Sequence, residues 1–263
     1  MPVNEEMKEQ PGKYHAPALE KGLDILEYLA FEGRPLSQTD IAAGINKNPN
    51  EIYRMLVCLE QRGYLLRDEI SGKYRQTLKL FHLSHRHSPI DEVRRAARYP
   101  MDDLAEKIKQ SCHLSVLYQD KLIVIAQTRS PEPIALSIEE GSLFPVMLTA
   151  SGRVLLSFMD EYERLEFLKR NDLFVSYPVS RQQKFLTGLR DIKTKGYYIT
   201  DSDLATGVVD ISVPIRNGLD AIASLTVSIL SIQFEKSLSY DDIVEIVRQA
   251  ADNISSNLGF TNL

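Results

Sequence analysis

The sequence predicts an α+β protein: a small, mostly helical N-terminal part and a larger C-terminal part built on an antiparallel sheet. Apolar residues recur at helical spacing in three segments before residue 63. A short hairpin pattern follows between residues 64 and 76. From residue 114 onward, β-rich runs bounded by turn residues are mixed with amphipathic helical runs. This mixture is typical of an antiparallel sheet that helices cover on one face.

The composition indicates a protein with ordinary globular cores. The chain has 263 residues, of which 43% are hydrophobic, so it needs no disulfide or metal to fold. Its two cysteines, Cys58 and Cys112, lack the spacing of a metal site, which favours a reducing compartment. Residues 1–17 lack the apolar segment of a signal peptide, and no apolar run approaches the roughly 18 residues of a membrane span. We therefore expect a cytoplasmic protein with no membrane partner.

The first two predicted helices have recognisable ends. Apolar residues at helical spacing cover residues 19–30, and Gly33 follows as a C-terminal stop. Ser37 is a suitable N-cap for a second helix, and Asp40, three residues on, completes a capping box. Gly44 is expected to allow the tight turn that follows this helix.

The third helix and a hairpin complete a winged helix-turn-helix. Asn48 is its predicted N-cap, Pro49 occupies its first position and Gly63 ends it. Short strands at residues 64–67 and 73–76 form the predicted wing. Two short helices joined by a turn, after a longer one, give the helix-turn-helix.

The third helix of such a module places its N-terminal end and exposed face in the major groove of DNA. Asparagine can read adenine there, and arginine can read guanine or hold a phosphate. Polar groups at the start of the second helix can bind phosphate, and a basic hairpin can follow the backbone. Residues 33–88 carry nine Lys and Arg against five Asp and Glu, whereas residues 89–263 carry 19 against 24. The candidate DNA-binding residues are Ser37, Gln38, Thr39, Asn48, Asn50, Tyr53, Arg54, Lys73 and Arg75.

With these residues the chain resembles the IclR family of bacterial transcription regulators. The matching string is ALEKGLDILEYLAFEGRPLSQTDIAAGINKNPNEIYRMLVCLEQRGYLLRD, followed by GKYR in the wing, and the resemblance covers about residues 18–258. It implies a double-stranded DNA operator, pairing into a homodimer or dimer of dimers, and a GAF-like domain that binds a small-molecule effector. Arg54 matches the family, whereas Tyr53 stands where a His is common. Glu51 either caps the third helix or accepts a hydrogen bond from cytosine.

The segment between the two parts is predicted to be helical over residues 78–87. A second helix follows after Pro89, and Pro100 is expected to kink or interrupt it. The predicted organisation is a DNA-binding domain at 16–77, linker helices at 78–99 and an effector-binding domain at 100–263. The linker histidines His82, His85 and His87 lack the further ligands of a metal site, so we expect no metal and no cofactor.

The second domain is predicted to alternate strands and helices. Strands are expected at residues 114–118, 121–127, 134–138, 197–200, 208–215 and 221–229. Helices are expected from about 151 to 159 and at 162–170, 181–194 and 241–258.

The effector site is predicted where residues 149–153 join a strand to a helix, because free N–H groups at a helix start attract polar ligands. In the resembled family this segment and the segments matching 201–207, 210–212 and the alternate residues Thr226 and Ser228 line the effector pocket. The candidate residues are Ala150, Ser151, Gly152, Asp201, Asp210, Ser212, Thr226 and Ser228.

Asp210 bears on the chemistry of the effector. Many family members have Cys at this position. A carboxylate disfavours an acidic ligand unless it is paired, with Arg153 or Arg129 as candidate partners. The effector class stays open among sugar-derived molecules, polyols and organic acids.

The sequence carries no motif of catalysis. It has no phosphate loop, dinucleotide fingerprint, GxSxG or HExxH. Cys112 and His113 are adjacent and point to opposite faces of a strand, which makes a poor nucleophile pair. We therefore expect no enzyme activity and assign no catalytic residue. Two alternatives stay open: a winged-helix module for protein contacts without an effector, and a metabolic enzyme with an appended regulatory domain.

Overall fold

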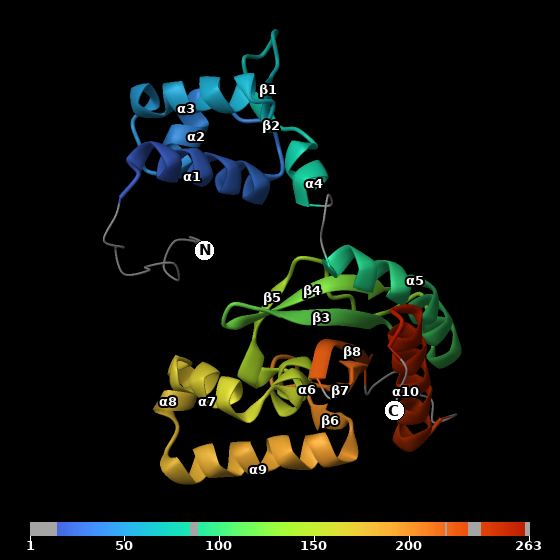
Figure 1. The fold of residues 1–263 in the computed structure, drawn as a ribbon. Coiled ribbons are helices and arrows are strands. Elements are labelled where there is room, and N and C mark those ends of the chain that lie inside the picture. The colour runs from blue at the N-terminus through green and yellow to red at the C-terminus, as the bar shows by residue number, and fades with distance from the viewer. Residues whose placement is uncertain (1–14, 85–88, 219, 231–237, 261–263) are drawn as a thin grey trace. The chain divides into compact units, whose positions relative to one another are not determined.

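The structure is a computed structural model, and it describes residues 15–84, 89–218, 220–230 and 238–260. Its contacts divide the chain into two compact units, Met1–Ser88 and Pro89–Leu263, each of which has its own core (Figure 1). The predicted domain boundaries near residues 77 and 99 stay predictions. In the structure, the side chains of Val93, Ala96 and Ala97, assigned from sequence to the linker, pack in the core of the second unit.

The first unit is the predicted three-helix module with a wing. Its elements are α1 (Pro17–Glu32), α2 (Gln38–Gly44), α3 (Pro49–Gln61), β1 (Leu65–Arg67), β2 (Tyr74–Gln76) and α4 (Lys79–Ser84). The two strands pair antiparallel, and Leu36 bridges to Tyr74. One apolar core joins all but α4, and its buried members are Ile25, Leu29, Leu36, Ile41, Ala42, Ile52, Leu56, Leu65 and Tyr74.

The caps predicted from sequence explain why these helices begin and end where they do. Ser37 and Asp40 form the capping box of α2. The Asn48 side chain accepts a hydrogen bond from the Asn50 N–H at the start of α3. Gly63 follows α3 with φ 75°, and its N–H donates to the Glu60 carbonyl. These caps fix the ends of the two helices that form the helix-turn-helix.

The predicted role of Gly44 is wrong. Gly44 is the last residue of α2, and the left-handed residue of the turn is Asn46, with φ 53°. Asparagine tolerates this conformation better than most residues. Gly44 instead gives room to a neighbouring ring, because a Cβ built there would stand 2.0 Å from Tyr28 Cζ.

The second unit is built on a six-stranded antiparallel sheet in the order β5-β4-β3-β8-β7-β6. The strands are β3 (Cys112–Tyr118), β4 (Lys121–Thr128), β5 (Leu143–Pro145), β6 (Tyr198–Asp201), β7 (Val208–Asn217) and β8 (Asp220–Leu230). The helices are α5 (Pro89–Ile108), α6 (Ala150–Phe158), α7 (Glu161–Lys169), α8 (Asp172–Ser176), α9 (Val179–Lys195) and α10 (Tyr240–Asn257). A short 3-10 turn, Val146–Leu148, precedes α6.

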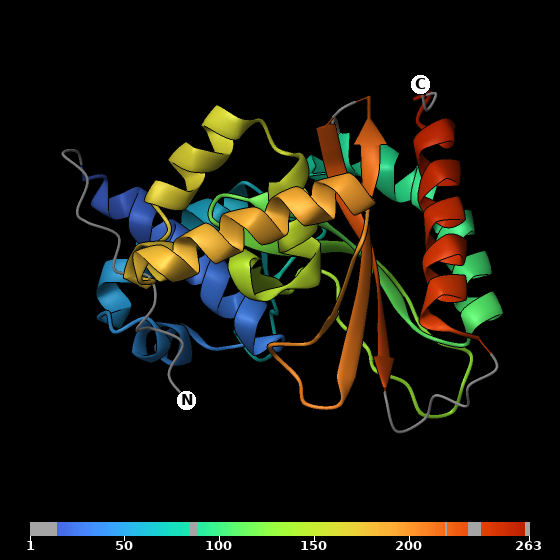
Figure 2. The same cartoon turned by 90° about the horizontal axis from the view of Figure 1, so that it is seen from below.

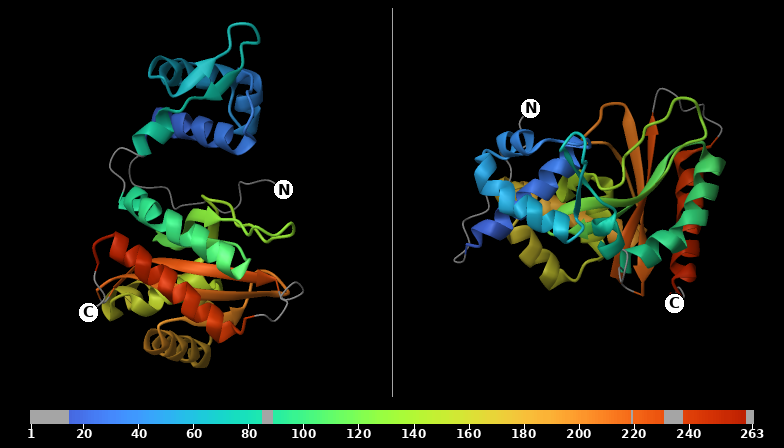
Figure 3. Two further views of the ribbon diagram at one scale, coloured as in Figure 1. Left: turned by 90° about the vertical axis from the view of Figure 1, so that its right-hand side faces the viewer. Right: turned by 90° about the horizontal axis from the view of Figure 1, so that it is seen from above.

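Helices cover both faces of the sheet, so the expectation of one covered face is wrong. Helices α5 and α10 lie side by side on one face, and α6 and α9 lie on the other (Figures 2 and 3). Alternate residues of β7 account for this arrangement. Val209, Ile211 and Val213 pack toward α5 and α10, whereas Asp210 and Ser212 face the α6 side. The polar residues that matter for a ligand therefore lie on the second face.

The predicted strand at 134–138 is also wrong. The residues form no strand, and β5 takes the edge position beside β4 instead. Leu136 and Ile138 point their apolar side chains into a cavity, so their alternation reflects burial against a cavity and not strand pairing. Pro131 and Pro133 also remove two backbone donors near this edge.

The linker differs in part from its prediction. Pro89 begins α5, and that helix runs without interruption through Pro100 to Ile108. His82 is an exposed residue of α4, whereas His85 and His87 lie outside the described residues. No helix in the described part of the chain combines the length and the apolar character needed to cross a membrane.

Candidate nucleic-acid interface and ligand cavity

Helix α3 has one buried face and one exposed face. Ile52 and Leu56 are fully buried in the core of the first unit. Asn50, Tyr53 and Arg54 are exposed, and Tyr53 keeps 51% of its surface open to solvent. The three side chains that we expect at base edges thus lie on the accessible face of the helix.

Glu51 is paired with the first helix. Its Oε2 accepts a hydrogen bond from Lys21 Nζ at 2.8 Å, and this contact, together with the charge of Lys21, lowers the pKa of the Glu51 carboxyl. The pair neutralises the negative charge at the start of α3 and joins α1 to α3. Neither interpretation of Glu51 from the sequence included this contact.

The start of α2 is tied to the start of α3. Gln38 Nε2 donates to the Pro49 carbonyl at 2.8 Å, so this side chain positions the third helix. The Ser37 hydroxyl lies 2.7 Å from Asp40 Oδ2 within the capping box. Thr39 is exposed. Contact of these three residues with phosphate stays a prediction.

The wing presents three exposed cations, the predicted Lys73 and Arg75 and also Arg67. Its turn is fixed by Asp68, whose Oδ1 accepts hydrogen bonds at 2.7 Å from both the backbone N–H and the hydroxyl of Ser71. Gly72 completes the turn with φ 67°. The turn is therefore ordered by its own side chains, and the basic residues lie beside it.

The second unit contains a cavity of about 210 Å³ on the α6 side of the sheet. The start of α6, strands β3, β4, β7 and β8, the edge strand β5 and the segments at 136–138 and 202–205 enclose it. Its lining residues are His113, Leu122, Leu136, Ile138, Phe144, Thr149, Ala150, Ser151, Ser202, Leu204, Ala205, Val208, Asp210, Thr226 and Ser228.

A network of buried hydroxyl groups reaches one wall of this cavity, where Ser151 and Thr226 belong to the lining. Ser151 Oγ lies 2.7 Å from Thr226 Oγ1, which donates in turn to Ser212 Oγ at 2.9 Å. Ser212 Oγ also lies 2.7 Å from Ser224 Oγ. Hydroxyls both donate and accept, so a chain of them can re-orient to suit a ligand hydroxyl. This network joins the start of α6 to β7 and β8.

Two ionisable groups face the cavity. Asp210 accepts a hydrogen bond from the Ser228 hydroxyl at 2.6 Å, and burial raises the pKa of its carboxyl. Burial lowers the pKa of the His113 imidazole to about 4, so it is neutral at pH 7. Among the described residues, the lining contains no Lys or Arg. In this part of the chain the Asp210 carboxyl therefore has no cationic partner in the cavity.

The structure brings five of the eight predicted effector-binding residues together. Ala150, Ser151, Asp210, Thr226 and Ser228 line the cavity. The other three lie outside the lining.

Ser212 is fully buried beside Thr226, its partner in the β7–β8 register, and Asp201 is an exposed residue at the end of β6. The Gly152 N–H donates to Thr149 Oγ1, the cap of α6. Sequence reasoning missed His113, which lies opposite Thr226 in the β3–β8 register. Strand alternation placed His113 and Cys112 on opposite faces of a strand. It did not show that the pairing of β3 with β8 brings His113 beside Thr226.

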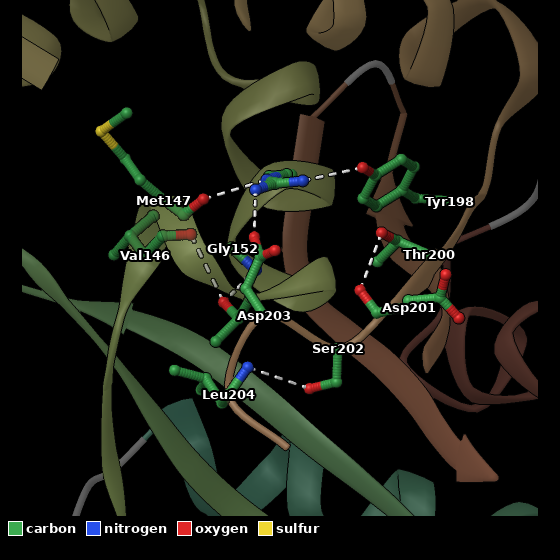
Figure 4. Close-up of polar contacts among 11 residues, drawn as sticks. Val146, Met147, Gly152, Tyr198, Thr200, Asp201, Ser202, Asp203 and Leu204 are labelled. Carbon is green, nitrogen blue, oxygen red and sulfur yellow. Dashed lines mark hydrogen bonds and ion pairs between the residues drawn. The ribbon is translucent and has the colours of Figure 1, made fainter. Parts of the chain in front are cut away.

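Arg153 does not pair with Asp210 as the sequence suggested. Its guanidinium donates to Asp203 Oδ2 at 2.6 Å, to the Tyr198 hydroxyl at 2.8 Å and to the Met147 carbonyl at 2.9 Å (Figure 4). These contacts hold the segment after β6 against α6. Three residues of that segment, Ser202, Leu204 and Ala205, line the cavity.

An exposed helix-turn-helix face with a basic wing, joined to a domain that encloses a polar cavity, defines a ligand-responsive DNA-binding regulator. Comparisons with known proteins agree. The family described as "Bacterial transcriptional regulator IclR C-terminal" matches residues 89–256, and the "IclR helix-turn-helix domain" matches residues 18–69.

The similar proteins are themselves regulators. HTH-type transcriptional regulator KdgR of Escherichia coli is 26% identical over 262 residues, covering 98% of both chains. The glycerol operon regulatory protein of Streptomyces coelicolor is 27% identical over 247 residues, covering 92% of this chain and 96% of that one. An IclR homolog from Microbacterium hydrocarbonoxydans, solved with 4-hydroxybenzoate, has a TM-score of 0.77 at 22% identity, covering 92% of this chain and 99% of that one.

The chain belongs to the IclR family of bacterial transcription regulators. It is a DNA-binding transcriptional regulator whose affinity for its operator is modulated by a small molecule bound in the C-terminal domain. Its fold is the one predicted, a winged helix-turn-helix followed by an α+β effector domain with an antiparallel sheet.

Proposed function

We propose that the exposed face of α3 reads the operator and that the cavity beside α6 binds a neutral, hydroxyl-rich effector. In this proposal Asn50, Tyr53 and Arg54 contact base edges, whereas Lys73 and Arg75 of the wing contact phosphates. Their exposure supports these roles. The remaining polar candidates, at positions 37–39 and 48, serve chiefly to position the helices against the phosphate backbone of the DNA.

The observation that carries the effector class is that Asp210 lies in a cavity whose described lining residues include no cation. An organic acid bound there would bring a second negative charge close to the Asp210 carboxylate. The start of α6 supplies only a partial positive charge. A polyol or sugar-derived ligand can instead donate hydroxyl hydrogens to Asp210 and exchange hydrogen bonds with Ser151, Thr226 and Ser228. A relative named for the glycerol operon agrees with this class.

Thermal-shift titration of the full chain tests the effector class. Glycerol, xylose and glucose are compared with gluconate and 4-hydroxybenzoate, an acid that was found with a homolog. We expect a neutral compound to raise the Tm of the wild type and the acids to leave it unchanged. An increase with the acids alone contradicts the proposal.

The variant Asp210→Asn tests whether Asp210 is the residue that selects neutral ligands over acidic ones. We expect it to accept acidic ligands that the wild type rejects, because it removes the repelling charge while keeping the size of the side chain. Asp201→Asn is the matched control, since Asp201 is exposed and lies outside the lining. Equal responses of both variants to every compound would rule out selection by Asp210.

We further propose that the chain acts as a homodimer or a dimer of dimers. Leu19, Leu23 and Phe31 are large apolar residues of α1 that are 47–65% exposed. Exposed apolar clusters of this kind favour pairing between copies of a chain. A dimer also matches a pseudo-palindromic operator, because its two α3 helices meet equivalent half-sites.

The relatives are regulators, and we propose that this chain has no enzyme activity and acts in the cytoplasm, where its DNA operator lies. Two groups that face the cavity, Asp210 and His113, could in principle exchange protons with a ligand. The Asp210 carboxyl already accepts a hydrogen bond from the Ser228 hydroxyl, and the His113 imidazole is neutral at pH 7. The full chain is incubated with any compound that raises its Tm. We expect the compound to remain unchanged, and its turnover would contradict the absence of enzyme activity.

A further inference from the structure

A second cavity, of about 310 Å³, lies on the far side of Arg153, between α6, α9 and β6. Its lining residues are Arg153, Tyr177, Arg181, Lys184, Phe185, Gly188, Leu189, Ile192 and Tyr198. None of these residues lines the cavity that holds Asp210. The two cavities therefore present different side chains to a ligand, although both lie in the second unit. We call the second cavity the α9 groove.

The charge of the α9 groove is positive. Three of its nine lining residues are cations and none is acidic. Asp203 neutralises Arg153. Arg181 and Lys184 form no ion pair with any carboxylate in the described part of the chain. An anion in the groove would thus meet two cations whose charge is not already neutralised.

Two of the arginines are already held in place. The Arg181 guanidinium lies 3.9 Å from the centre of the Tyr177 ring, which fixes its plane. Arg153 uses one N–H each for Met147, Tyr198 and Asp203, so two of its five N–H groups have no partner among the described residues. Cations fixed before binding lose less conformational entropy when they bind an anion.

The remainder of the α9 groove is apolar. Leu189 and Ile192 are buried beneath it, and Phe185 is half-buried at its side. An inorganic ion would leave these surfaces in contact with water. A ligand with an apolar body would cover them and gain hydrophobic stabilisation.

Gly188 keeps the middle of the α9 groove open. It lies inside α9, where glycine is unfavourable compared with alanine by about 1 kcal/mol. A Cβ built on it meets no atom of the described residues within 4 Å, so none of their packing contacts requires glycine there. A larger residue would extend into the groove, and the glycine is explained if the groove accepts a ligand.

We propose that the α9 groove is a second ligand site, for a small organic anion that carries an apolar body. Its carboxylate or phosphate group binds Arg181 and Lys184, with the two unused N–H groups of Arg153 nearby. Its apolar body lies over Gly188, Leu189 and Ile192. This site is independent of the effector class proposed for the other cavity.

Isothermal titration of the full chain with phenyl phosphate at low ionic strength tests the site, because salt weakens contacts with exposed cations. We expect saturable binding at millimolar concentration or below. Inorganic phosphate and phenol are each expected to bind at least about ten-fold more weakly, since each lacks one half of the ligand.

Variants locate the binding. Arg181→Gln with Lys184→Gln removes the two unneutralised cations, and Gly188→Leu fills the groove. Each is expected to weaken phenyl phosphate about ten-fold or more. Arg153 is left intact because it also holds Asp203 and Tyr198. Arg190→Gln, another exposed cation of α9 outside the lining, is the matched control and should bind like the wild type.

Circular dichroism and Tm confirm that each variant is folded before it is titrated. The two charge substitutions lie at exposed positions, so they keep the test valid if Gly188→Leu fails to fold. The proposal is overturned if the wild type shows no saturable binding, or if the folded charge variant binds phenyl phosphate as tightly as the Arg190→Gln control.

Discussion

At the scale of single residues, burial decides which predicted groups can meet a ligand. The helix start at residues 149–153 pointed to Ser151, and the resemblance to the IclR family added Asp210 and Thr226. Sequence reasoning could not show that Thr226 lines the cavity whereas Ser212 does not, because the two lie side by side on one face of the sheet as partners in the β7–β8 register. His113 escaped for the same reason, since the β3–β8 pairing brings it to the cavity.

His113 makes the stability of the second domain depend on pH. Its pKa is about 4 in the folded chain against an ordinary 6.5, so the unfolded chain binds its proton first as pH falls. The stability that neutral His113 provides is fully present above pH 6.5 and is lost between 6.5 and 4. Denaturation at several pH values should show His113→Gln losing less stability than the wild type in this window, by an amount on the order of 3 kcal/mol. Parallel curves for the two proteins would show that His113 is not desolvated.

Asp210 should have an effect in a different pH range. Burial raises its pKa, so its stabilising, protonated form is present below the ordinary value of 3.8 and is lost as pH rises through the raised value. The stability that Asp210→Asn gains over the wild type is therefore expected to be larger at pH 7 than at pH 4. Unfolding curves at these two pH values check this, and an advantage confined to pH 4 would contradict the raised pKa.

At the scale of elements, local signals predicted helix ends better than strand edges. The capping residues Ser37 and Asn48 act within a few residues of themselves, so the sequence contains the whole interaction. A strand needs a partner strand outside its own segment, and the pattern of the segment does not name that partner. Residues 134–138 had a strand-like pattern, but the three-residue β5 took the edge beside β4, and the apolar residues turned to the cavity.

Two helical glycines give a matched test of the packing on α6 and α9. A Cβ at Gly152 would stand 2.0 Å from the Val146 carbonyl oxygen, which belongs to the backbone and cannot rotate away. Gly152→Ala is therefore expected to destabilise the domain by about 1–3 kcal/mol. Gly188→Ala meets open space and should stabilise it by about 1 kcal/mol. Urea denaturation measures both; a shift of the same sign for both variants would contradict the packing described.

At the scale of the whole molecule, the sequence predicted two functional parts and their order, which the family matches confirm. It did not predict that helices cover both faces of the sheet. Whether one or both faces are covered depends on the face against which α6 and α9 pack. Their amphipathic patterns show which side of each helix is buried, but they do not specify a face of the sheet. The pairing of two chains also lies beyond one chain's pattern and stays a proposal.

Sedimentation velocity of the full chain tests this pairing. We expect the wild type to be a dimer or larger, and Leu19→Glu with Leu23→Glu to shift it toward monomer, because both side chains are exposed on α1. Tyr162→Glu, an exposed aromatic residue of α7 in the other unit, is the control and should keep the wild-type state. A monomeric wild type would exclude the proposed homodimer.

Titration of selected DNA duplexes tests whether the exposed face of α3 reads the operator. Duplexes selected from a random pool by the wild type are titrated, by fluorescence anisotropy, with wild type, Arg54→Ala and Arg190→Ala over a range of salt concentrations. We expect Arg54→Ala to bind about ten-fold or more weakly and to lose its preference for the selected sequence. Arg190→Ala, altered on α9 of the other unit, should match the wild type. If Arg54→Ala binds the selected duplex with wild-type affinity and preference, α3 does not read the operator through this face.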